Sequence, residues 1–546
     1  MATSHVCGSS GVKNAVKEEP PCRITRAAFL TGLFFALFYS QLPLFSKAQN
    51  TYFLHGLAKS GLGYLDRDWL ATTVDPFPLF SLLVEFTFRY LSKYLFHIYY
   101  VILLWIFFVG IWGIVSRSFD FDIKTGKEKY KFGLMLLLLI NIPAVNSVVY
   151  GLSGISLLNT FQYGVAGQRL TGLVFQPCNF GILIVLSIYL LLCDRPFPAV
   201  AIANLAALFH SSYLLSAFVV TAVGMVSLFK GEGNIKRKMR KPLLLGIFSF
   251  LSILPILIYI YIMFSPTSPD IYNRAQDLLA NVRIPHHAKP AVWFSGLTVI
   301  KIVIMATALV LVRKKKIFPV LASFFGFSLG LSLLQVITGW RILALLFPWR
   351  ISVILVPVSS AIVVGYIIDV FFKTFTPGRG FKKVLHAAAA MTVIGVAFLS
   401  VYTAVNSHKR FYHNEWVGMM KFVKAAKKPG DLFLVPPGVN QETDMQNFRL
   451  FTGAPVLVDY KSHPYKDSEI IEWFDRIDTA RNFYYNGREG RELCALLEKI
   501  TADYGITHVV TGAEYPLDCE ITETIYRDAY YSVSRIRGTV SSPGPD

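Results

Sequence analysis

The chain has 546 residues, 54% of them hydrophobic, and a formal net charge of +19. This composition excludes an ordinary soluble protein and is typical of a polytopic membrane protein. The charge is uneven, because residues 1–404 hold 36 Lys/Arg and 14 Asp/Glu, whereas residues 405–546 hold 17 and 20. A basic excess confined to the apolar part predicts loop charges that set membrane topology, and it argues against a nucleic-acid partner.

Hydropathy divides the chain into four parts. We predict a disordered cytoplasmic N-terminus (1–23), a helical transmembrane module (24–404), an external α/β domain (405–537) and a disordered tail (538–546). The module holds about eleven stretches that approach the ~20 apolar residues needed to cross a bilayer. The first begins near Ile24 and lacks a small-residue cleavage site, so we expect a retained helix and not a signal peptide.

Loop charges predict the orientation of the module. Cytoplasmic loops are rich in Lys and Arg. Four loops have this character, at 117–131, 230–241, 313–316 and 372–383. Residues 196–229 lie between two cytoplasmic charges and are too long for one span, so we expect two short helices around a break at His210. The loop 46–96 and the C-terminal domain then share the external or lumenal face of a bacterial inner membrane or of the endoplasmic reticulum.

Residues 405–537 alternate helical segments with short β-branched runs, which predicts an α/β domain around a central sheet. Cys494 and Cys519 both lie in this domain. Two interpretations are open, a disulfide in an oxidising compartment or two free thiols. The expected elements are a helix near 413–427, strands at 432–435 and 455–459, helices at 468–483 and 490–501, a strand at 507–510 and two later strands.

The external loop 46–96 concentrates acidic residues, with four carboxylates inside twenty positions. Asp66 and Asp68 lie two residues apart, so in a loop one of them could remove a proton from an acceptor hydroxyl, or both could ligate Mg²⁺ or Mn²⁺. The alternative is structural: Asp66 caps a helix that starts at Arg67, and Asp68 pairs with a basic neighbour.

Two further carboxylates of this loop are candidate substrate contacts. Asp75 precedes Pro76, where a helix can begin, so capping is the favoured interpretation. Glu85 lies in an apolar run four residues before Arg89, and an i,i+4 ion pair is as good an explanation as a role in a site.

Basic residues are scarce on the predicted external face, where Arg169, Arg341 and Arg350 lie. Arg binds phosphate through a bidentate fork and keeps its charge near lipid, so the three are candidate phosphate ligands. The alternative is that they anchor helix ends at the membrane surface, as Trp340 and Trp349 would.

Other polar residues have a structural interpretation that we favour. His210, at the predicted helix break, is a candidate substrate contact because intramembrane ionisable groups are often functional, but a hydrogen-bonded structural histidine is the favoured alternative. Four C-terminal residues follow strand candidates, where α/β domains bind ligands, although surface salt bridges explain them better. They are Arg449, Asp459, Lys461 and His463.

The architecture resembles the GT-C superfamily of membrane glycosyltransferases, which includes protein O-mannosyltransferases, the aminoarabinose transferase of lipid A and the oligosaccharyltransferases. The resemblance rests on a first span at Ile24–Phe45, the acidic motif Asp66-Arg67-Asp68, an amphipathic stretch at Pro76–Phe96 and an extra domain after the module. The chain lacks the adjacent Asp-Glu pair of the O-mannosyltransferases and the WWDYG-like motif of the oligosaccharyltransferases.

This resemblance implies transfer of a sugar from a polyprenyl-phosphate donor to an acceptor glycan, lipid or protein at the external face. Asp68 or Asp66 would take the acceptor proton, while Arg341 and Arg350 would hold the phosphate. Two other functions stay open: a lipid or solute transporter with an external cap, and a catalytically inactive scaffold. A transporter usually shows paired broken helices and midplane charges, of which this sequence has few.

Overall fold

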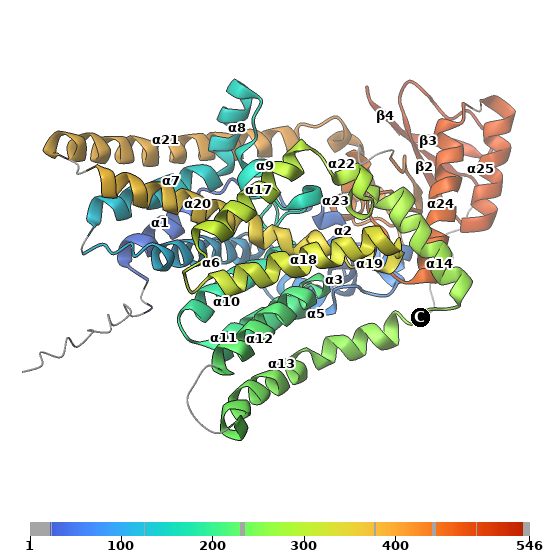
Figure 1. Ribbon diagram of the computed structural model, residues 1–546. Coiled ribbons are helices and arrows are strands. Elements are labelled where there is room, and N and C mark those ends of the chain that lie inside the picture. The colour runs from blue at the N-terminus through green and yellow to red at the C-terminus, as the bar shows by residue number, and fades with distance from the viewer. Residues whose placement is uncertain are drawn as a thin grey trace, which may run out of the picture.

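The computed structural model describes residues 22, 24–124, 126–229, 235–375, 378–438, 444–487 and 489–538. The segments predicted to be disordered, 1–23 and 538–546, lie almost entirely outside the described residues. Figure 1 shows the helices of the module as one bundle, with the C-terminal domain, in red, at one end of it.

The module consists of helices of very different length. Its 3-10 turns are η1 (Leu65–Arg67), η2 (Val165–Gly167), η3 (Pro177–Gly181), η4 (Ser211–Tyr213) and η6 (Pro348–Ile351), and η5 (Leu279–Arg283) is a π-helical turn. Its α-helices are α1 (Arg26–Leu37), α2 (Gln49–Tyr52), α3 (Leu54–Lys59), α4 (Trp69–Thr72), α5 (Pro78–Tyr90), α6 (Leu95–Ser118), α7 (Lys127–Asn141), α8 (Pro143–Ser153), α9 (Leu157–Phe161), α10 (Ile182–Leu192), α11 (Pro196–Phe209), α12 (Leu214–Phe229), α13 (Ile235–Met263), α14 (Pro269–Leu278), α15 (Pro285–Ala288), α16 (Pro290–Trp293), α17 (Gly296–Leu311), α18 (Phe318–Thr338), α19 (Arg341–Leu345), α20 (Ser352–Thr374) and α21 (Arg379–Tyr412).

Long apolar helices give the chain the character of a membrane protein. The described residues contain six helices long and apolar enough to cross a bilayer, or seven if α7 and α8, which bend by 68° at Pro143, form one span. Four more apolar helices, α1, η3–α10, α11 and α17, are shorter than a full span. The expected count of about eleven spans is therefore not confirmed, because many apolar stretches become short or bent helices.

The break predicted inside 196–229 is confirmed. Helix α11 ends at Phe209, His210 is extended, and the chain resumes in η4 and α12, which packs against α11. His210 makes the turn itself, because its Nδ1 faces the Ser212 Oγ at 2.8 Å and accepts from the Ser212 N–H at 3.3 Å. The structural interpretation of this histidine fits these contacts.

Helix α5 occupies the stretch predicted to be an amphipathic surface helix. It has 13 residues, too few to cross a bilayer. It buries Phe80 and Val84 against the module and exposes Leu82, Phe86 and Tyr90. The exposed face is therefore apolar too, as suits a helix that meets the membrane surface.

The C-terminal domain has the predicted α/β character. Its sheet has the order β1-β2-β4-β3, with β1 and β2 parallel and the other pairs antiparallel. The strand expected at 455–459 is reduced to a single bridge between Phe433 and Val456. The elements are α22 (Trp416–Ala426), β1 (Phe433–Leu434), η7 (Asp444–Asn447), α23 (Phe448–Thr452), α24 (Asp467–Tyr485), α25 (Gly490–Tyr504), β2 (His508–Gly512), β3 (Thr522–Arg527) and β4 (Tyr531–Ile536).

Two disulfides link the described residues. Cys494 and Cys519 pair within the C-terminal domain, which settles the alternative that the sequence left open. Cys22 pairs with Cys193 at the opposite end of the bundle, on the side predicted to be cytoplasmic. Since disulfides occur at both ends, they do not decide which face of the protein meets an oxidising compartment.

Candidate functional site

The loop 46–96 is joined to the C-terminal domain by a buried triad, Asp68, Arg449 and Asp459. Oδ1 of Asp68 accepts the Leu70 N–H at 3.0 Å and caps α4. Its Oδ2 accepts Arg449 Nε at 2.7 Å and the Val456 N–H at 3.0 Å. Arg449 also donates from Nη1 to Asp459. Asp68 and Arg449 are 0% and 2% exposed, so the triad lies in the interior of the interface.

This geometry favours the structural interpretation of the acidic motif. Both oxygens of Asp68 accept hydrogen bonds from buried donors, so neither faces a site where an acceptor hydroxyl could bind. Asp66 is exposed in η1 and does not cap the helix in the way expected. The sequence also assigned Arg449 and Asp459 to the surface, whereas they are buried partners of the loop. The catalytic role predicted for Asp68 and Asp66 stays untested.

Further polar contacts fasten the loop to the domain. Asn50 Nδ2 donates to Asn447 Oδ1 at 2.8 Å, and the Val74 N–H donates to Glu469 Oε1 at 2.9 Å. The Tyr64 N–H donates to the carbonyl of Gly453 at 2.9 Å. Loop and domain therefore lie on the same side of the bundle, as predicted.

Gly63 is the closest backbone contact of this junction. Its φ is +61°, and an added Cβ would lie 2.2 Å from the Gly453 carbonyl oxygen. Gly61 has a similar φ of +83° but open space around it. We expect Gly63→Ala to weaken the contact between the loop and the domain, because the new methyl group would clash with Gly453. Gly61→Ala should cost only the backbone strain, about 1 kcal/mol. Protease digestion of the junction measures this, and equal susceptibility of the two variants would contradict it.

Next to the triad, five side chains from separate segments form the arginine–tyrosine cluster. They come from segments far apart in the sequence, and Tyr52 interacts with both arginines and with Tyr465. The members are Tyr52 of α2, Tyr213 of η4, Arg283 of η5, Arg350 of η6 and Tyr465 of the domain.

Both guanidinium groups of the cluster lie over aromatic rings. Arg350 Cζ lies 5.6 Å from the ring centre of Tyr213, and Arg283 Cζ lies 5.4 Å from that of Tyr460. Arg283 donates from Nη2 to the Lys461 carbonyl at 2.5 Å. The Nε atoms of both arginines are buried without a hydrogen-bond partner among the described residues. Each arginine thus keeps a donor that a bound acceptor would satisfy.

The cluster carries unbalanced positive charge. Burial and then the charge of Arg283 lower the pKa of Lys461 to about 8, and the same two causes lower the pKa of His463 to about 3. Asp459 acts on Arg283 and Lys461 but is already paired with Arg449. Tyr465 is 36% exposed although burial raises its pKa, so its ring is surrounded by protein yet reached by solvent. The site is suited to an anion.

Asp75 lies two residues before Phe77, whose ring contacts two tyrosines of the cluster. Its Oδ1 accepts the Phe77 N–H at 2.9 Å, which forms a turn just before α5 in place of the predicted cap. Oδ2 is buried and lacks a hydrogen bond; Lys59 Nζ lies 3.7 Å away. The ring of Phe77 contacts Tyr52 and Tyr465 at centroid distances of 5.3 and 5.8 Å. Asp75 is therefore linked to the cluster through the ring of Phe77, and the cation at its Oδ2 is Lys59.

The other predicted site residues separate into two groups. Arg341 pairs with Asp277 at 2.9 Å on the exposed surface, and Glu85 pairs with Arg89 at 3.2 Å. Arg169 is exposed and lies over the ring of Tyr163, but its charge reaches Lys461 at the rim of the cluster. Of the three predicted phosphate ligands, Arg350 alone is a member of the cluster, since Arg341 is satisfied by its own carboxylate.

The predicted divalent cation finds no suitable set of ligands. Within the described ranges, no group of three or more His, Cys, Asp or Glu side chains is placed to hold a metal ion. Asp68 uses both oxygens in the triad, and Asp66 points to solvent. The chemistry proposed below therefore uses no step through a metal.

Sequence reasoning missed Arg283 and the three tyrosines. Arg283 could have been found by the same argument that selected Arg341, because it is another basic residue on the predicted external face. The tyrosines carry no such signal, since the chain has 27 of them. Only the fold distinguishes those that meet an arginine.

Comparison with known proteins gives one match. Residues 414–480 match a family described as Domain of unknown function (DUF6798). This segment runs from α22 into α24 and contains Arg449, Asp459 and Tyr465, so it includes the part of the domain that contacts the first loop. The chain has no match among curated proteins.

Proposed function

We propose that this chain is a membrane glycosyltransferase that moves a sugar from a polyprenyl-phosphate donor to an acceptor at the external or lumenal face. The observation that supports this most is the arginine–tyrosine cluster, a cationic site where the C-terminal domain meets the helical module. A lipid-borne phosphate would reach such a site from the bilayer.

Arg283 and Arg350 would hold the donor phosphate. Both keep a buried Nε–H that has no hydrogen-bond partner among the described residues. The hydroxyl of Tyr213 already donates to the Cys178 carbonyl at 2.6 Å, so the two guanidinium groups are the donors offered to the phosphate. The sugar–phosphate bond gives its electron pair to the phosphate when it breaks, so fixed positive charge stabilises the leaving group more than the intact donor.

Asp75 would act as the general base, in place of Asp68. Its Oδ2, which accepts no hydrogen bond from the described residues, would take the proton of the acceptor hydroxyl while the hydroxyl oxygen attacks the anomeric carbon. One bond forms between acceptor and sugar, one bond breaks between sugar and phosphate, and the products are the glycosylated acceptor and polyprenyl phosphate. Asp68 would keep the loop in place through Arg449 and take no part in the proton transfer.

Binding of polyprenyl phosphate to the protein in nanodiscs tests the anion site, with polyprenol, which lacks the phosphate, as the matched probe. We expect Arg350→Gln and Arg283→Gln each to weaken binding of the phosphate by about 10- to 150-fold, the range for one hydrogen bond to a charged group. Polyprenol binding should not change in either variant.

Arg341→Gln is the matched control, because Arg341 is exposed and paired with Asp277. It should bind polyprenyl phosphate as the wild type does. An equal loss of polyprenyl-phosphate binding in Arg341→Gln and Arg350→Gln would contradict the assignment of the cluster. Wild-type binding in both Arg283→Gln and Arg350→Gln would also contradict it.

A further inference from the structure

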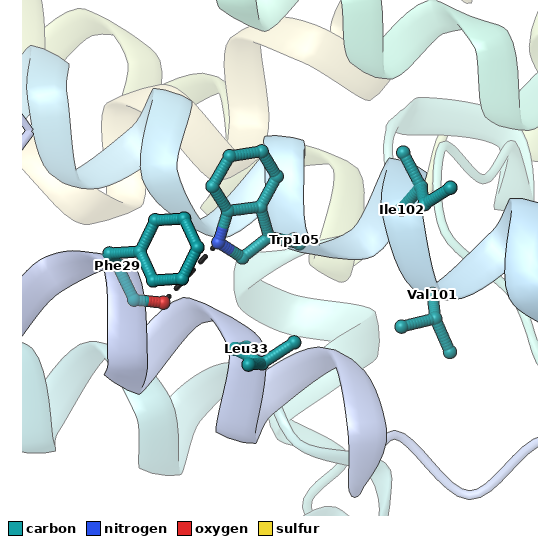
Figure 2. A pocket seen from close by; sticks show the side chains of 5 residues that line it. All are labelled: Phe29, Leu33, Val101, Ile102 and Trp105. Carbon is teal, nitrogen blue, oxygen red and sulfur yellow. Dashed lines mark hydrogen bonds between the residues drawn. The ribbon is translucent and has the colours of Figure 1, made fainter.

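Two cavities lie one behind the other along the seam between α1 and α6, away from the arginine–tyrosine cluster. The smaller one has a volume of about 180 Å³ and is lined by Phe29, Leu33, Val101, Ile102 and Trp105. Figure 2 shows these side chains and the hydrogen bond from Trp105 Nε1 to the carbonyl of Phe29, which closes one end. The indole N–H of Trp105 is the one polar side-chain atom among the residues that line this smaller cavity.

The second cavity is larger, about 320 Å³, and α21 forms its third wall. It begins one helical turn further along both helices, at Leu37 after Leu33 and at His97 before Val101. One turn advances about 5.4 Å, so the two cavities adjoin. Leu37 and Val401 on its rim are 61% and 53% exposed. Apolar side chains this open on membrane helices face lipid.

The larger cavity is polar where the helices approach the external side. His97 Nδ1 faces Gln41 Oε1 at 2.9 Å, and His408 Nδ1 faces the Ala404 carbonyl at 2.9 Å. Each Nδ1 faces an acceptor oxygen and so donates to it, and in this tautomer Nε2 is an acceptor. Ser400 is 1% exposed, and its Oγ has no hydrogen-bond partner among the described residues.

We propose that this groove binds one bilayer lipid whose headgroup carries a primary ammonium. The three N–H donors of an ammonium match the two imidazole Nε2 atoms and the Ser400 hydroxyl. None of the described residues lining the cavity is charged, so nothing there favours an anionic lipid over a zwitterionic one. The acyl chain of the lipid continues into the smaller cavity, beside Leu33 and Trp105. The site is independent of the proposed sugar transfer.

Native mass spectrometry of the protein relipidated with equal amounts of phosphatidylethanolamine and phosphatidylcholine tests this. The two headgroups have the same charge, but choline has no N–H donor. We expect the wild type to retain phosphatidylethanolamine at least about 10-fold over phosphatidylcholine, as a few net hydrogen bonds allow. The double variant His97→Phe/His408→Phe should lose this preference.

Leu33→Trp fills the chain end of the groove without touching the headgroup, so it should lower the retention of both lipids. Ile262→Trp, on the exposed face of α13, is the control and should retain lipid as the wild type does. Equal retention of the two lipids by the wild type would overturn the proposal. A parallel relipidation with equal amounts of phosphatidylethanolamine and phosphatidylglycerol tests for an anion site, and stronger retention of phosphatidylglycerol would also overturn the proposal.

Discussion

Asp75→Asn is expected to lower sugar transfer by about two to four orders of magnitude, the usual contribution of a general base. The amide keeps the Oδ1 that accepts the Phe77 N–H, so the turn before α5 is preserved. It cannot take a proton from the acceptor. Loss of the contact with Lys59 costs little, because the Lys59 side chain is 55% exposed. The assay uses proteoliposomes, a panel of labelled polyprenyl-phosphate sugars and an extract of acceptors.

Asp66→Asn is the matched control for this prediction. Asp66 belongs to the same loop but is exposed, so we expect the wild-type rate. A wild-type rate in Asp75→Asn would remove Asp75 from the mechanism. A large loss of sugar transfer in Asp66→Asn would instead support the catalytic role that the sequence predicts for the motif Asp66-Arg67-Asp68.

Arg449→Met is expected to destabilise the junction between loop and domain by about 3–5 kcal/mol, the cost of removing one partner from a buried ion pair. Asp68 and Asp459 would then be buried together without a cation, and each repels the other. We expect a lower melting temperature in detergent and rapid proteolysis between α21 and α22.

Arg535→Met removes an ion pair from the same domain, but the side chains of Arg535 and Glu523 are half exposed, so we expect little loss of stability. The difference in melting temperature between the two variants therefore measures the effect of burying the ion pair. Adding Asp68→Asn and Asp459→Asn to Arg449→Met should recover part of the stability, because no charge remains buried. A melting temperature of Arg449→Met equal to that of Arg535→Met would contradict the role of the triad.

Local patterns predicted much of the fold. The β-branched runs and amphipathic helices of residues 405–537 predicted the sheet and its helices, because periodicity reflects which face is buried. The number of spans was not confirmed, because hydropathy measures how apolar a stretch is and does not show where it bends. Pro143 bends one apolar stretch by 68°, and α1 ends after 12 residues.

The candidate site was less predictable, since its contacts join distant parts of the chain. Asp68 and Arg449 are 381 positions apart, so the sequence could identify Asp68 as unusual but could not find its partner. Arg341 and Arg350 looked equivalent until the fold placed Asp277 beside one and Tyr213 beside the other. Scarcity of a residue type selects candidates, and only packing separates a free charge from a satisfied one.

A structure of the protein in nanodiscs with saturating polyprenyl phosphate tests the central claim most directly. We expect phosphate density within hydrogen-bonding distance of the guanidinium groups of Arg283 and Arg350, at about 2.7–2.9 Å, with the polyprenyl chain leading into the bilayer. Phosphate density beside Arg341 or in the α1–α6 groove, with the arginine–tyrosine cluster empty, would contradict the proposed site.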